Sequence, residues 1–96
     1  MKNKDKVYLQ SVISRNPEIV HSMMDGEVVM MSVDQGLFLG IDKIGTHIWD
    51  LLDTPVKVET LVETLVAYYD VERSVCENDT LLFLNDMFKK KVILIE

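Results

Sequence analysis

The chain has 96 residues, of which 48% are hydrophobic and 27% are charged, and its formal net charge is −6. This length and composition predict one folded domain over residues 1–96 rather than a disordered chain. The acidic charge argues against a nucleic-acid partner, because phosphate binding requires clustered Lys and Arg. No apolar run reaches the roughly 20 residues of a membrane-spanning helix, so no membrane partner is expected. The single cysteine, Cys76, excludes an internal disulfide and is typical of a cytoplasmic protein.

The N-terminal residues 1–12 are polar, and we expect them to form a flexible arm. A short strand is predicted over residues 7–13. No apolar block and no small-residue cleavage site follow the basic residues of the arm, which argues against a signal peptide. Pro17 separates the arm from the first clearly strand-like segment.

Three strands are predicted over residues 19–24, 28–33 and 37–41. Asp25-Gly26 and Asp34-Gln35-Gly36 lie between them, and glycine in such turns accepts positive φ at low cost. Strands joined by turns this short pair antiparallel, so we expect a three-stranded meander. A sheet this small leaves an unpaired edge, whose backbone N–H and C=O groups can pair with another chain.

Three helices are predicted after the strands. Asp42 is a suitable N-cap for the first helix, which Pro55 ends. The second covers residues 56–70, and Ser74 with Glu77 predicts a capping box at the start of the third. The apolar positions that repeat with helical spacing are Ile44, Ile48, Leu51 and Leu52 in the first helix, Val58, Leu61, Val62, Leu65, Val66 and Tyr69 in the second, and Cys76, Thr80, Phe83, Leu84 and Met87 in the third. Residues 92–95 predict a short final strand.

The order of these elements predicts an α+β fold, in which a three-stranded antiparallel sheet is followed by three helices in a winged helix-turn-helix-like arrangement. A winged helix that reads DNA needs Arg, Lys, Asn or Gln facing the groove. The third helix offers Asn78 and Asn85, but no Lys or Arg between residues 75 and 88. A transcriptional regulator therefore stays an alternative that the charge disfavours.

Catalytic, metal-binding and cofactor-binding residues are not predicted anywhere in the chain. His21, His47 and Cys76 are scattered, and none of them belongs to a pair with the spacing of metal ligands. His47 and Asp50 lie three residues apart, which is typical of an exposed pair on a helix. Cys76 heads an apolar stripe, which favours a core position over a reactive thiol. We therefore expect a protein that is not an enzyme.

Four features in a fixed order carry a resemblance. They are the Asp-Gly turn before the second strand, the segment "GLFLGIDKIGTHIWDLL", the "YDV" before the third helix and the run "CENDTLLFL" within that helix. Together they resemble the PqqD family of peptide-recognition elements, in particular its stand-alone members in lasso-peptide pathways, over residues 13–94. Two positions depart from the family: Thr80 stands where Val is usual, and the three lysines at 89–91 replace a common Gly.

The resemblance implies a protein that holds the leader region of a precursor peptide as an added strand, in a groove between the third strand and the third helix. It would present the leader to the peptidase of the same pathway, with the cyclase as a further candidate partner. The peptide-binding residues so implied are Gly36, Leu37, Phe38, Leu39 and Gly40 of the strand and Cys76, Asp79, Thr80, Leu82 and Phe83 of the helix. A subunit that only scaffolds the modifying enzymes is a second alternative. The open edge also leads us to expect homodimers formed by edge pairing or strand exchange.

Overall fold

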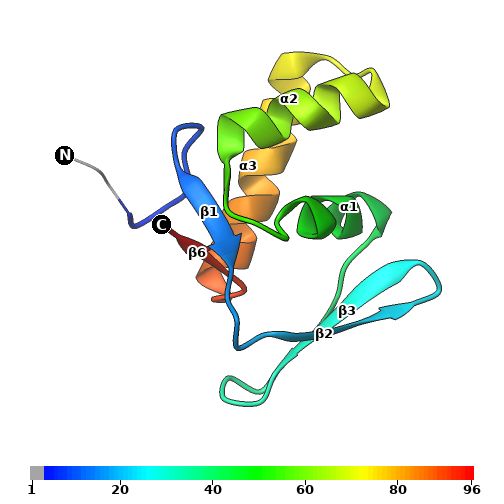
Figure 1. The fold of residues 1–96 in the computed structure, drawn as a ribbon, viewed down its shortest axis with the longest axis vertical. Helices are drawn as coiled ribbons and strands as arrows, with labels where there is room; N and C mark the ends of the chain where they lie inside the picture. The colour runs from blue at the N-terminus through cyan, green and yellow to red at the C-terminus, as the bar shows by residue number, and fades with distance from the viewer. Residues whose placement is uncertain (1–3) are drawn as a thin grey trace.

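The computed structural model describes residues 4–96. In chain order it contains β1 (Val12–Arg15), β2 (Val20–Met24), β3 (Glu27–Ser32), β4 (Leu37–Gly40), α1 (Lys43–Leu51), β5 (Val56–Lys57), α2 (Val58–Tyr69), α3 (Arg73–Lys89) and β6 (Ile93–Ile95) (Figure 1). The strands form two sheets, with the orders β2-β3-β4 and β5-β1-β6. The predicted α+β fold, with a three-stranded antiparallel sheet and three helices, is confirmed, and the second sheet is an addition to it.

The β2–β3–β4 sheet is the predicted meander. Met24 pairs with Glu27 across a two-residue turn, in which Asp25 and Gly26 have φ values of 55° and 82°. Positive φ at both turn positions is the geometry that matches the twist of a tight hairpin. Gly36, with a φ of 63°, closes the second turn before β4. The two turns thus fix the register of all three strands.

The second sheet joins distant parts of the chain. β1 lies at its centre and pairs antiparallel with β5 on one side and β6 on the other. The final strand predicted over residues 92–95 is present as β6, whereas the strand predicted over residues 7–13 begins only at Val12. The start is later because a turn precedes it, in which the Ser11 N–H donates to the Tyr8 carbonyl and the Ser11 hydroxyl accepts from the Tyr8 N–H. β5 was not predicted, because its two residues carry no periodic signal.

Part of the expected flexible arm over residues 1–12 packs against α3. The Val7 side chain is only 1% exposed. Asn85 of α3 holds the Val7 backbone on both sides, because its Oδ1 accepts from the Val7 N–H at 2.7 Å and its Nδ2 donates to the Val7 carbonyl at 3.1 Å. The arm is therefore anchored at Val7, while residues 1–3 lie outside the described part of the chain.

The helix starts agree with the sequence at α1 and differ at α3. Asp42 caps α1 as predicted, since its carboxylate accepts from the Gly45 N–H at 2.8 Å. The capping box predicted for α3 is wrong, because the helix begins at Arg73, before Ser74. Glu77 instead forms an ion pair with Arg73 at 2.9 Å, and this hydrogen bond raises the pKa of the guanidinium.

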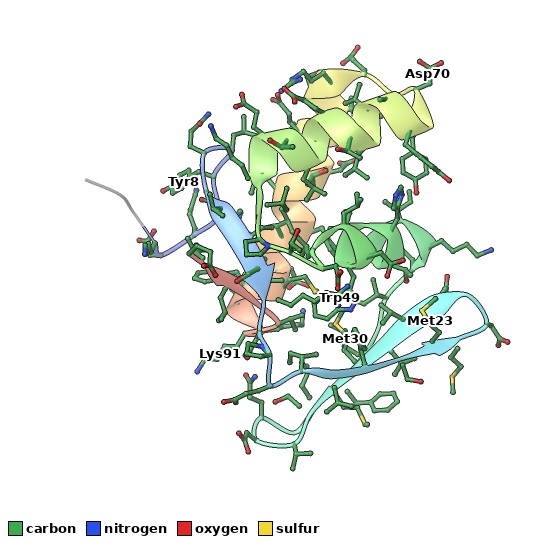
Figure 2. The ribbon with its side chains drawn as sticks, in the orientation of Figure 1. Tyr8, Met23, Met30, Trp49, Asp70 and Lys91 are labelled. Atoms are coloured by element: carbon green, nitrogen blue, oxygen red, sulfur yellow. The ribbon has the colours of Figure 1, made fainter. Side chains whose placement is uncertain are left out.

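α1 lies between the β2–β3–β4 sheet and the α2–α3 pair (Figure 1). Trp49 of α1 is buried against this sheet beside Met30, as Figure 2 shows, and its Nε1 donates to His21 Nδ1 of β2. The Arg15 guanidinium stacks on the Trp49 ring at 4.5 Å and donates to the Trp49 carbonyl, which links β1 to α1. Side chains from both sheets and all three helices therefore share one core.

Within residues 4–96, no helix has both the length and the apolar character needed to cross a membrane.

Candidate functional site

The edge strand β4 offers backbone groups for pairing. Within residues 4–96, β4 pairs with β3 alone, so its second edge is open. The Ile41 N–H donates to the Val28 carbonyl at 2.9 Å, which makes these opposite residues a hydrogen-bonded pair. Such pairs alternate along an antiparallel ladder, so Leu37 and Leu39 bond to β3. The N–H and C=O groups of Phe38 and Gly40 consequently point out of the open edge.

The side chains of β4 alternate between the two faces of the sheet. Leu37 and Leu39 are half-buried and pack against the core. Phe38 faces the other way and is 72% exposed. An extended peptide paired with β4 would alternate in the same manner, with every second side chain directed toward the helices.

A cavity of about 250 Å³ lies between the start of α1 and the middle of α3. The chain enters it directly from β4, because Asp42, two residues after Gly40, is part of the cavity wall. Its full lining is Asp42, Ile44, Gly45, Ile48, Asp79, Thr80 and Phe83. The chain therefore passes from β4 to the wall of this cavity within two residues.

A second cavity of about 130 Å³ continues the first toward the end of α2. Its lining is Ile44, Leu65, Tyr69, Val71, Val75, Cys76, Asp79 and Thr80. Ile44, Asp79 and Thr80 line both cavities. We call the two cavities together the α1–α3 groove. Most of its wall is apolar, and the carboxylates of Asp42 and Asp79 lie on it.

The close approach of α1 and α3 depends on Gly45. A Cβ atom added at Gly45 would lie 3.1 Å from two ring atoms of Phe83 and would also overlap the Ile41 side chain. Contacts this short are unfavourable in a packed interior. The absence of a side chain at Gly45 thus allows Phe83 to form the floor of the larger cavity.

The sequence matches the family described as coenzyme PQQ synthesis protein D (PqqD) over residues 27–93. The chain belongs to the PqqD family. The matched region begins with β3 and ends with β6, so it includes β4 and all three helices. The resemblance inferred from the sequence is therefore confirmed.

A solved structure gives a second comparison for this PqqD-family chain. It is similar to the structure described as "TbiB1 in Complex with the TbiA(beta) Leader Peptide", with 30% sequence identity and a TM-score of 0.77. The similarity covers 83% of this chain and 93% of the other. No significant match is found among curated proteins.

The residues predicted for peptide binding divide into three groups. Cys76, Asp79, Thr80 and Phe83 all line the α1–α3 groove. The strand residues Gly36, Leu37, Phe38, Leu39 and Gly40 line neither cavity and form, or lie next to, the open edge. Leu82 lines neither cavity and is 72% exposed on α3. Neither cavity therefore supports the predicted contact between Leu82 and a bound peptide. The other nine residues remain candidates for peptide binding.

Sequence reasoning missed several residues of the groove. Ile44 starts the apolar stripe predicted in the first helix, and Tyr69 ends that of the second, but neither was predicted to bind the peptide. Ile44 is 55% exposed and lines both cavities, and Tyr69 lines the smaller one. Val71 belongs to the "YDV" segment that helped to carry the family resemblance, but neither Val71 nor Val75 was predicted to bind the peptide. A period of 3.6 residues identifies an apolar face but does not distinguish a core from an open groove.

The polar chemistry of the groove is limited. The Cys76 Sγ and Thr80 Oγ1 atoms lie 3.8 Å apart within hydrogen-bond range, and both side chains are buried. Among residues 4–96, no group of three His, Cys, Asp or Glu side chains is arranged to hold a metal ion. What the groove offers a ligand is apolar surface, two carboxylates and a neighbouring strand edge.

Proposed function

We propose that this PqqD-family chain is a non-catalytic binding protein for the leader region of a ribosomally synthesised precursor peptide. The leader binds in an extended conformation, as a strand added to the open edge of β4. Its alternate side chains enter the α1–α3 groove. The observation that carries the proposal is that Phe38 and Gly40 direct their backbone groups out of the open edge, on a strand whose chain continues into the groove wall at Asp42. Strand addition of this kind takes affinity from the backbone and specificity from pockets for alternate side chains.

The finer part of the proposal concerns the pathway. The bound leader belongs to a lasso-type precursor, and the protein delivers it in the cytoplasm to the leader peptidase, with the cyclase as a further partner. The resemblance to stand-alone family members and the likeness to a protein solved with a leader peptide support this assignment. The buried free thiol of Cys76 is compatible with a reducing compartment.

The experiment removes one backbone donor from the open edge. Gly40→Pro eliminates the N–H that points toward the added strand, and proline is tolerated on the solvent side of an edge strand. A fluorescently labelled leader peptide is titrated with each protein, and its anisotropy is followed. We expect the affinity to fall about five- to tenfold or more, which corresponds to the loss of one hydrogen bond of about 1 kcal/mol and a steric contribution from the ring.

Gly40→Ala is the matched control. It adds a Cβ atom, for which there is open space, and keeps the N–H group. The affinity of this variant should stay within about twofold of the wild type. Proline at Leu37 or Leu39 would be a poorer test, because those N–H groups bond to β3 and their loss would weaken the sheet itself. Equal binding by the Pro and Ala variants, or no saturable binding by the wild type, would refute strand addition at β4.

Anisotropy of the label is preferable to the fluorescence of Trp49. Trp49 is only 3% exposed and faces Arg15 and His21. It lines neither cavity of the groove. A peptide bound at β4 would therefore change the surroundings of Trp49 little.

A further inference from the structure

The outer face of the β2–β3–β4 sheet carries three apolar side chains in one row. Val20 of β2 lies opposite Met31 of β3, and Met31 lies opposite Phe38 of β4. Directly opposite residues of antiparallel strands place their side chains on the same face. The three side chains, which we call the outer row, are 56%, 42% and 72% exposed. They form an apolar band across all three strands.

The inner face of the same sheet is the one that packs on the body of the protein. Met30, the neighbour of Met31, is fully buried and lies beside Trp49 (Figure 2). The outer row faces away from α1, and none of its members is buried by another element of residues 4–96. A contiguous exposed apolar band on a small protein is typical of a surface that binds a partner. It is distinct from the α1–α3 groove, which none of the three residues lines.

The charge around the outer row indicates the kind of partner. Residues 16–42, which contain the whole sheet, include no Lys and no Arg. The topology places Glu18 and Asp34 at one end of the sheet and Asp25 and Glu27 at the other. The apolar band is therefore bordered by carboxylates at both ends. A second copy of the chain docked face to face would bring these like charges together, which is unfavourable.

We propose that the outer row is the docking surface for a protein partner that presents an apolar strip flanked by Lys or Arg. The leader peptidase of the pathway is the partner tested, and only this choice of probe rests on the function proposed above. A strand added to β4 would place side chains next to Phe38 on the same face. The docked partner would then lie beside the bound peptide.

The test uses the full-length protein and replaces two residues of the row that lie outside the open edge. Val20→Thr with Met31→Thr removes apolar contact and places a β-branched side chain, which suits a strand, at both positions. Binding of the purified peptidase is measured by biolayer interferometry, in about 50 mM and about 500 mM NaCl. We expect the double variant to bind about tenfold or more weakly, since exposed apolar residues at the centre of an interface contribute most of its affinity. Wild-type binding should also weaken at the higher salt concentration.

A charge-reversal variant and a control variant test which residues contribute to peptidase binding. Glu18→Lys with Asp34→Lys reverses the charge at one end of the row and should also weaken peptidase binding. Tyr68→Ser is the matched control, because Tyr68 is a 69% exposed aromatic residue on α2 that lines neither cavity. It should bind the peptidase as the wild type does.

Leader binding, followed by anisotropy on the same samples, tests the proposed function separately. If the wild type binds the peptidase but no leader, the proposed function fails and the docking surface stands. The docking surface is refuted if the threonine variant binds the peptidase as tightly as the wild type does. It is also refuted if wild-type protein does not bind the peptidase, or if sedimentation shows a wild-type dimer that the threonine variant dissociates.

Discussion

One side chain, Asn85, attaches Val7 of the N-terminal segment to α3. Its amide donates to the carbonyls of Val7 and Leu81 and accepts from the Val7 N–H, with distances of 3.1, 3.0 and 2.7 Å. Asn85→Ala removes all three hydrogen bonds, each of which contributes about 1 kcal/mol, and partly releases the buried Val7 side chain. We expect the free energy of unfolding to fall by about 3–4 kcal/mol, a large share of the roughly 5–15 kcal/mol of an ordinary domain.

The assay is urea denaturation followed by circular dichroism, in a cycle of four proteins. They are the wild type, Asn85→Ala, a chain lacking residues 1–7, and the truncated chain with Asn85→Ala. In the truncated chain only the bond to Leu81 remains to be lost, so the substitution should cost about 1 kcal/mol there. Hydrogen exchange of the Val7 amide should be slow in the wild type and fast in Asn85→Ala. If the substitution costs the same in both backgrounds, or if the Val7 amide exchanges fast in the wild type, the anchor of Val7 by Asn85 is refuted.

Three further predictions concern the groove and the helices. Gly45→Ala should lower leader affinity and destabilise the fold by about 1–2 kcal/mol, because the added Cβ overlaps the Ile41 side chain and crowds Phe83, and these contacts outweigh the gain in helix propensity. Phe83→Leu in the same chain should restore only the part of the loss that Phe83 causes, and an unchanged stability of Gly45→Ala would contradict the close approach. Asp42→Ala should lower the free energy of unfolding, measured by heat or urea, by about 1 kcal/mol, whereas Asp42→Asn, which still caps α1, should lower it little. Equal losses of stability in the two variants would contradict the cap. Duplex DNA should not bind the protein in a gel-shift assay at low salt, and salt-dependent binding would support the transcriptional alternative.

The sequence predicted the parts of the fold that repeat regularly over many residues. The meander follows from alternating apolar residues and two turns, and α2 follows from its regular apolar stripe. The second sheet could not be predicted, because β5 has two residues and β1 has four, and neither contains enough positions for a pattern. The pairing of β1 with β6 also joins opposite ends of the chain, and no local signal reports such a contact.

The sequence likewise indicated only part of the lining of the α1–α3 groove. Cys76, Asp79, Thr80 and Phe83 were implied by the resemblance to the PqqD family, and the structure places all four on the groove wall. The sequence could not exclude Leu82 from the groove, because the packing of α3 against α1 decides which side chains of α3 line the groove. Ile44 was not predicted for the groove, because a helical stripe identifies apolar positions and the packing of α1 against α3 determines which of them stay open.

The position of β1 at the centre of its sheet has a consequence for folding. Ile13 pairs with Ile95, so this sheet can be completed only after residue 95 has left the ribosome. The β2–β3–β4 meander needs only neighbouring residues and can form as soon as residue 41 has emerged. Local pairing is fast and closure of a long loop is slow. A nascent chain therefore exposes the open edge of β4 before the rest of the protein is complete, at the stage when unwanted pairing with other chains is easiest.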